Sequence, residues 1–366
     1  MRVPFLDLAA AHSELDPEIQ SAITDVRRSN RFVLGEQVSS FEVEFARYVG
    51  ARHCVGVGNG LDALTLALRA CELQPGDEVL VPTNTFIATW LAVMHAGGVP
   101  VGVEPDRTTY NMDPVDAERR ISGRTRFILP VHLYGQPADL GPLRALAART
   151  GCALIEDAAQ AHGAEYQGSR VGSGTAVAWS FYPGKNLGAL GDAGAVTTDV
   201  DEVAEKLRLL RNYGSETKYV HELTGVNSRL DEMQAAVLRV KLRYLDEWNQ
   251  RRTDVSNRYR AALADTALVL PSVIEGTRPV WHLYVVRTAE RDGLRDHLAA
   301  RGVETQIHYP IAPHRQGAFR QYGGSEFPIA DELAGSVLSL PMGPHMQADD
   351  VAYVAGAIRD HASPRP

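Results

Sequence analysis

Short apolar runs alternate with amphipathic stretches through the first half of the chain, and this alternation predicts how the chain folds. Seven runs rich in valine, isoleucine and alanine have the length of buried strands, at residues 54–57, 78–81, 99–104, 126–131, 153–156, 176–181 and 194–198. Helical patterns fall between several of them, at residues 63–71, 87–95 and 140–150. Because alternating strands and helices form a parallel sheet with both faces covered, we expect an α/β fold with a mostly parallel central sheet.

Helical patterns also open the chain and dominate it after residue 202. We expect helices at residues 15–29, at 203–210 and along 230–264, then a strand from residue 281 and a helix at 291–301. A chain of 366 residues exceeds the size at which one core stops growing. The sequence therefore predicts a large domain at residues 1–245 and a smaller C-terminal α/β domain at residues 246–366.

Composition and charge exclude several classes of protein. The formal net charge is −8 and no block of lysine and arginine appears, which argues against a nucleic-acid binder. Residues 90–103 form the longest apolar region, which is broken by glycine and proline and is too short to cross a membrane. Cys54, Cys71 and Cys152 lack the spacing of metal ligands. We expect a cytoplasmic protein without a metal site.

Candidate chemistry begins with Lys185, which lies in the glycine-rich stretch SFYPGKNLGALGDAG at residues 180–194. A lysine amine becomes a nucleophile when burial or a nearby cation disfavours its ammonium form, as in Schiff-base lysines. The simpler alternative is a solvated loop lysine, which is the commoner case. One motif does not decide between them.

A second stretch, ALIEDAAQAHGA at residues 153–164, places Asp157 at the end of a predicted strand. A carboxylate there could cap a helix, bind a metal, or keep a pyridine nitrogen protonated, as pyridoxal phosphate requires. A third stretch, VGVGNGLDALTLAL at residues 55–68, has a Gly58, Asn59, Gly60 turn before a helix, where backbone amides can bind a phosphate. Together the three stretches favour pyridoxal 5′-phosphate.

The chain also resembles the DegT/DnrJ/EryC1/StrS sugar aminotransferases, which are pyridoxal-phosphate enzymes of fold type I, the aspartate aminotransferase fold. The resemblance covers nearly the whole chain and rests on the ordered blocks PFLDL, GNGLDAL, PTNTFIAT, PVHLYGQPAD, EDAAQAHGA, SFYPGKNLGALGDAGA, NYG, GVNSRLDEMQAA and HYP. The sequences of the lysine block and of VHLYGQPAD look most like the branch that aminates 3-keto-6-deoxyhexoses on nucleoside diphosphates.

The resemblance implies a role for individual residues. It makes Lys185 the catalytic residue, and it assigns to the cofactor Gly58, Asn59, Gly60, Phe86, Asp157, Gln160, Ser180, Lys185 and Asn227. Among these, Phe86 would stack on the pyridine ring, Gln160 would reach the ring hydroxyl, and Asn227 would reach the neighbouring cofactor's phosphate across a dimer interface. It assigns to the nucleotide-sugar pocket Tyr182, Tyr213, Tyr219, His308 and Tyr309, and it would let Arg229 bind the carboxylate of the amino donor.

Several of these residues also have a simpler, structural explanation. Phe86 could be a core residue, and Arg229 could form an ion pair with Asp231 or Glu232. We interpret His162 as a packed histidine that orients Asp157, and not as a catalytic base.

The implied activity is transfer of an amino group from an amino acid, glutamate in our prediction, to the C3 ketone of a dTDP-3-keto-6-deoxyhexose. A homodimer with shared active sites is implied too. Three other readings remain: a 4-aminotransferase of the same family, a dehydratase relative, and a regulator that binds the cofactor without catalysis. The dehydratases carry histidine at the lysine position, so Lys185 argues against that reading.

Overall fold

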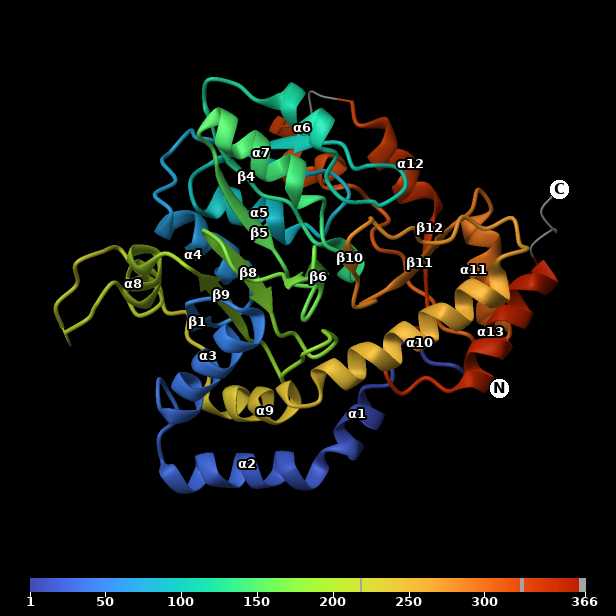
Figure 1. Ribbon diagram of the computed structural model, residues 1–366, viewed down its shortest axis with the longest axis horizontal. Coiled ribbons are helices and arrows are strands. Elements are labelled where there is room, and N and C mark those ends of the chain that lie inside the picture. The colour runs from blue at the N-terminus through green and yellow to red at the C-terminus, as the bar shows by residue number, and fades with distance from the viewer. Residues whose placement is uncertain (218, 323–325, 362–366) are drawn as a thin grey trace.

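The computed structural model describes residues 1–217, 219–322 and 326–361, and at its centre lies a seven-stranded sheet (Figure 1). In spatial order the strands are β1 (His53–Val57), β9 (Gly194–Thr198), β8 (Ala176–Ser180), β5 (Ala153–Asp157), β4 (Thr125–Ile128), β2 (Glu78–Pro82) and β3 (Val99–Val103). Strand β9 runs antiparallel to both neighbours, and the other pairs are parallel. The predicted mostly parallel sheet is confirmed.

Helices cover both faces of this sheet because its strands bury side chains on both sides. In β2, Val79 and Val81 pack on one face while Leu80, between them, packs on the other. The first face is covered by α4 (Gly60–Ala70), α5 (Ala88–His95) and α8 (Asp201–Leu210). The second is covered by α3 (Glu36–Val49), α6 (Pro114–Arg120), α7 (Leu140–Thr150) and α9 (Glu232–Leu242).

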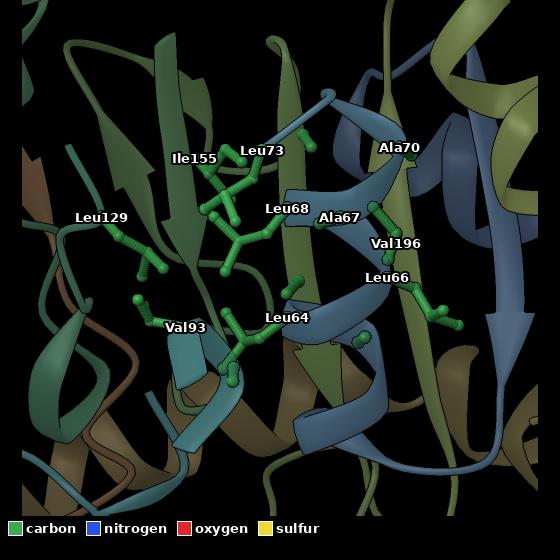
Figure 2. Close-up of a cluster of buried hydrophobic side chains, with 14 of the residues drawn as sticks. Leu64, Leu66, Ala67, Leu68, Ala70, Leu73, Val93, Leu129, Ile155 and Val196 are labelled. Atoms are coloured by element: carbon green, nitrogen blue, oxygen red, sulfur yellow. The ribbon is translucent and has the colours of Figure 1, made fainter. Parts of the chain in front are cut away.

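Helix α4 is deeply buried, and it carries the predicted phosphate turn at its start. Figure 2 shows Leu64 and Leu68 pointing from α4 toward Ile155 of β5 and Val93 of α5. Leu64 and Leu68 are at most 2% exposed. Truncating such a leucine to alanine costs about 3–5 kcal/mol, so the packing of α4 fixes where its N-terminus lies.

A second apolar core forms around the C-terminal part of the chain. It is built on α10 (Leu245–Leu263), β11 (Tyr284–Arg287), α11 (Arg291–Ala300), β12 (Val337–Leu340) and α13 (Ala348–His361), with α12 (Pro328–Ser336) beside it. Val3 joins this core, because the N-terminal segment crosses to it before α1 (Leu8–Glu14) and α2 (Asp16–Ser29) return to α9. The first few residues thus pack with the C-terminal part of the chain.

Smaller elements connect the two parts of the chain. They are β6 (Glu165–Tyr166), β7 (Ser169–Arg170) and β10 (Thr277–Arg278), with 3-10 turns at Leu133–Gly135, Pro313–Arg315 and Gly317–Tyr322. The helical run expected along residues 230–264 is divided into α9 and α10 by a turn in which Arg243 and Tyr244 donate backbone hydrogen bonds. Helix α3 is absent from the sequence prediction. No helix in the described part of the chain is long and apolar enough to cross a membrane.

Candidate active site

Lys185 lies in the turn that follows β8, where its backbone N–H donates to the carbonyl of Tyr182 at 2.8 Å. Phe181 before it and Leu187 after it are fully buried and hold the turn against the core. The turn opens onto a cavity of about 400 Å³. Predicted site residues in the cavity wall are Gln160, Tyr182, Lys185, His308 and Tyr309. A larger hollow of about 650 Å³ between α2, α3 and α9 contains no predicted site residue.

The Lys185 ammonium is enclosed by protein, although part of the side chain faces the cavity. Burial lowers its pKa from 10.5 to about 8, and the attraction of Asp157 opposes that shift. A group with this pKa is neutral in roughly a tenth of the molecules at pH 7, several hundred times more often than an ordinary lysine. The lysine is therefore placed to act as a base, and it is not the solvated loop residue of the simpler alternative.

Asp157 ends the central strand β5 and is only 5% exposed. Its Oδ2 accepts a hydrogen bond from Thr89 Oγ1 at 2.9 Å, and its Oδ1 accepts one from the N–H of Ala159 at 3.1 Å. Burial raises the pKa of this carboxyl, and these hydrogen bonds and the Lys185 charge oppose the rise. A buried carboxylate that is short of cations is suited to hold a proton on a heterocyclic nitrogen.

Asn59 caps α4, and this use of its side chain was missed in the sequence analysis. Its Oδ1 accepts from the N–H of Asp62 at 2.9 Å, and its amide donates to Asp62 Oδ2 at 3.1 Å. The N–H of Gly58 donates to Ser228 Oγ at 2.9 Å. Asn59 and Gly58 thus shape the turn from β1 into the helix.

The open amides at the start of α4 face the end of β8. Among the described residues, the backbone N–H groups of Gly60 and Leu61 have no acceptor. A Cβ added to Gly60 would lie 2.7 Å from the Cβ of Ser180, so a larger residue would displace the serine. Free amides, the helix dipole and a neighbouring hydroxyl together suit a phosphate.

The polar wall of the cavity is a chain of buried groups. Gln160 Oε1 accepts from the N–H of Tyr134 at 2.6 Å, and its amide donates to the hydroxyl of Tyr309 at 3.2 Å. The Tyr309 ring lies 5.6 Å from that of Phe86, which is 56% exposed and so is not a core residue. Burial and the Lys185 charge lower the pKa of His308 to about 4, so this imidazole is neutral.

The remaining predicted residues lie on the segment at residues 212–229, which projects beyond α8 at the edge of the molecule (Figure 1). Tyr213, Tyr219, Asn227 and Arg229 do not line the cavity of their own chain. Asn227 is exposed and bridges to Asn212. The placement brings the lysine, aspartate and glutamine together and leaves these four residues outside the cavity of their own chain.

The contact that the sequence predicted between His162 and Asp157 is wrong. Among the described residues, His162 makes no hydrogen bond to Asp157, because the chain turns after β5 and buries the imidazole against Trp179 and Phe181, at ring distances of 5.3 and 5.5 Å. Burial there lowers the His162 pKa to about 3. Thr89 takes the expected role beside Asp157.

The alternative ion pair of Arg229 with Asp231 or Glu232 does not form. Arg229 donates instead to Asn212 Oδ1 at 3.1 Å, and its guanidinium lies 5.7 Å from the centre of the Tyr213 ring. Glu232 is unavailable because it accepts backbone hydrogen bonds at the start of α3, from Gly35, Gln37 and Val38.

Three site residues escaped the sequence analysis: Thr89, Asn186 and His282. Thr89 lies in PTNTFIAT, and Asn186 follows the lysine directly, so both stood in motifs that were already noted. His282 stands in the run WHLYVVRT, which was interpreted only as a strand. A polar residue at the start of an otherwise apolar run is the signal that could have found it.

The residues present fit pyridoxal phosphate. Asp157 suits the ring nitrogen, the start of α4 with Ser180 suits the phosphate, and Lys185 is an amine enclosed between them with no carboxylate within ion-pair distance among the described residues. In the described part of the chain, no group of three or more His, Cys, Asp or Glu residues could hold a metal ion. The donor set therefore matches the cofactor and not a metal.

Comparison with known proteins gives one consistent result. The DegT/DnrJ/EryC1/StrS aminotransferase family matches residues 13–359. The chain is 53% identical over 365 residues to a dTDP-3-amino-3,4,6-trideoxy-alpha-D-glucose transaminase of Streptomyces venezuelae, covering 99% of this chain and 96% of that protein. It is 49% identical to a dTDP-3-amino-3,6-dideoxy-alpha-D-galactopyranose transaminase of Aneurinibacillus thermoaerophilus, with 97% and 98% covered.

A relative whose name refers to sensory transduction, and not to a transaminase, is equally similar. The erythromycin biosynthesis sensory transduction protein EryC1 of Saccharopolyspora erythraea is 53% identical, with 98% of this chain and 99% of that protein covered. Among solved structures, DesV of S. venezuelae in complex with a ketimine intermediate matches with a TM-score of 0.97 and 52% identity, covering 98% of each chain.

Proposed function

The chain belongs to the DegT/DnrJ/EryC1/StrS aminotransferase family, and from this premise we propose that it transfers an amino group to the C3 ketone of a dTDP-linked 3-keto-6-deoxyhexose. It is a pyridoxal-phosphate-dependent transaminase of fold type I. The observation that carries the proposal is the enclosed pair of Lys185 and Asp157, in a chain that matches a 3-amino-sugar transaminase over 99% of its length. Such enzymes serve deoxyaminosugar and antibiotic biosynthesis.

The chemistry of the site follows from its own residues. Bound pyridoxal phosphate supplies a ring that withdraws electrons from the carbon atom that loses a proton. Asp157 holds a proton on the ring nitrogen, and Thr89 keeps the carboxylate in place. Lys185 Nζ, neutral in a useful fraction of molecules, removes the proton from Cα of the amino donor and later delivers a proton to C3 of the sugar. One amine serves as base and acid in both half-reactions.

Cofactor orientation is divided among the remaining residues. With the cofactor bound, Gly60 and Ser180 would hold the phosphate, Gln160 would contact the ring hydroxyl, and Phe86 would stack on the ring. Tyr182, His308 and Tyr309 offer hydrogen bonds to the nucleotide sugar without adding fixed charge to the cavity.

We further propose a homodimer whose partner completes the site. Tyr213, Tyr219, Asn227 and Arg229 do not line the cavity of their own chain, as expected of residues that serve a neighbouring site. The segment also exposes apolar surface, with Val220 53% and Leu223 38% exposed, as expected of a contact surface.

Glutamate is the proposed amino donor, and the cytoplasm is the proposed location. The cysteines Cys54, Cys71 and Cys152 are all free thiols, which suits a reducing compartment.

The test has two stages. The visible spectrum of the purified protein is recorded before and after addition of glutamate, and again for Lys185→Ala. A cofactor band that glutamate shifts, and that the alanine variant no longer shifts, supports transamination. A native protein without such a band, or an alanine variant that still turns over, refutes it. A band that glutamate shifts in the native protein would also rule out a regulator without catalysis.

The second stage decides the position of amination. Separately prepared dTDP-3-keto and dTDP-4-keto sugars are incubated with the glutamate-treated enzyme, and the products are identified by NMR. Amination at C3 supports the proposal, whereas amination only at C4 replaces it with the 4-aminotransferase alternative.

A further inference from the structure

His282 faces the same cavity as Lys185, and the mechanism above gives it no role. It stands two residues before β11, at the junction between the turn that carries Lys185 and the second core. Its Nδ1 lies 3.2 Å from Oδ1 of Asn186, the residue that follows the lysine. What His282 can do in the cavity depends on which of its ring nitrogens carries the proton.

Hydrogen bonds between buried asparagine side chains determine which ring nitrogen of His282 carries the proton. Asn249 donates through Nδ2 to the backbone carbonyl of His162 at 2.8 Å, which leaves its Oδ1 as an acceptor. Asn186 donates through Nδ2 to Asn249 Oδ1 at 2.9 Å and to the carbonyl of Val280 at 2.9 Å. Because a carbonyl can only accept, both amides are fixed in one orientation.

The orientation of Asn186 then fixes the tautomer of His282. The Asn186 atom facing the imidazole is Oδ1, an acceptor, so Nδ1 of His282 must donate to it. Burial and the charges of Lys185 and Arg252 lower the pKa of His282 well below its usual value. The ring is therefore neutral with its one proton on Nδ1, and Nε2 is a bare lone pair.

This lone pair accepts no hydrogen bond from any residue that the structure describes. Among the described residues, the hydrogen bonds of the His282 side chain consist of the one to Asn186. A neutral acceptor next to the reacting lysine repels carboxylate and diphosphate oxygens and attracts an O–H or N–H group. A substrate that fills the cavity can supply such a group.

We propose that Nε2 of His282 accepts a hydrogen bond from the C2 hydroxyl of the sugar, and this rests on the function proposed above. We take the substrate to be deoxy at C4 as well as at C6, because the S. venezuelae relative is named for a 3-amino-3,4,6-trideoxy sugar. Such a 3-keto sugar, linked to diphosphate at C1, has one free hydroxyl group, at C2, next to the ketone on which Lys185 acts. His282 thus recognises the substrate beside its reacting carbon and disfavours 2-deoxy sugars.

The experiment is a cycle between protein and substrate. Wild type and His282→Phe are assayed in the sugar half-reaction with the 3-keto substrate and with its 2-deoxy analogue. We expect each single change to lower kcat/KM about tenfold, and both together to lower it no further, because one hydrogen bond is lost in every case. Losses that multiply would overturn the proposal, since the residue and the hydroxyl would then act independently.

A second arm separates recognition from a structural role. The glutamate half-reaction, which involves no sugar, should stay within about twofold of wild type in His282→Phe, as in the control His95→Gln at an exposed position. Equal slowing of both half-reactions overturns the proposal. His282→Gln keeps an acceptor and should recover part of the sugar half-reaction.

A spectroscopic arm stands apart from activity and from the fold of the variants. In protein labelled with ¹⁵N-histidine, the signal lost in His282→Gln should be that of a neutral ring protonated at Nδ1. A ring protonated at Nε2 overturns the proposal. If wild type fails to aminate any 3-keto sugar, the proposed function fails, whereas this signal still decides the state of His282.

Discussion

Replacing Lys185 by methionine removes the ammonium and keeps most of the length and volume of the side chain. In the cofactor-free protein that ammonium is enclosed and has no carboxylate within ion-pair distance among the described residues. Folding therefore strips water from a charge that gains little in return. We expect the methionine variant to be more stable than wild type at pH 7, although it is inactive.

The pKa values give the size and the pH range of the effect. The Lys185 pKa falls from 10.5 in the unfolded chain to about 8 in the fold, and this net shift, which includes the attraction of Asp157, corresponds to about 3 kcal/mol at 25 °C. Screening by water in the cavity reduces this to a net gain of about 2 kcal/mol. Because the unfolded state binds more protons between pH 8 and 10.5, the penalty in wild type is complete below pH 8 and disappears as the pH rises through 10.5.

Urea unfolding at a fixed protein concentration, followed by circular dichroism at pH 7 and pH 10, measures both effects. The methionine variant should gain about 2 kcal/mol at pH 7 and much less at pH 10. Lys206→Met serves as the control, because Lys206 forms a surface ion pair with Glu72 and its loss should change stability by less than about 1 kcal/mol. A methionine variant no more stable than wild type at pH 7 would refute the reasoning.

Three further substitutions test other parts of the site. Thr89→Val removes the hydroxyl that donates to Asp157, and should lower the free energy of unfolding by about 1–2 kcal/mol in urea; Thr89→Ser should retain most of it. Glu232→Gln weakens three backbone hydrogen bonds at the start of α3, and a thermal melt should show a lower Tm; an unchanged Tm would contradict this role. Gly60→Ala places a methyl group against the serine opposite, so fluorescence titration should show weaker cofactor binding, while Gly356→Ala, with open space around it, should bind normally.

Much of the fold could be predicted from local pattern. The strands and their helices follow from apolar periodicity, and β9 and α7 were predicted with their observed bounds. Helix α3 was not predicted because the residue before it is a glycine, which has no side chain to cap the helix. The carboxylate of Glu232, nearly two hundred residues away, caps it instead. The division between α9 and α10 was not predicted because the helical pattern of the sequence continues across it.

The sequence by itself determined the chemical groups of this protein and the family to which they belong. Lys185, Asp157 and the glycine turn stand in recognisable local motifs, since each requires a particular side chain or backbone freedom at one position. Only the tertiary structure decided the environment of those groups, because burial and hydrogen-bond direction depend on segments that are distant in the chain. It lowered the lysine pKa, gave Thr89 the place beside Asp157, and set the tautomer of His282 through its hydrogen bond to Asn186.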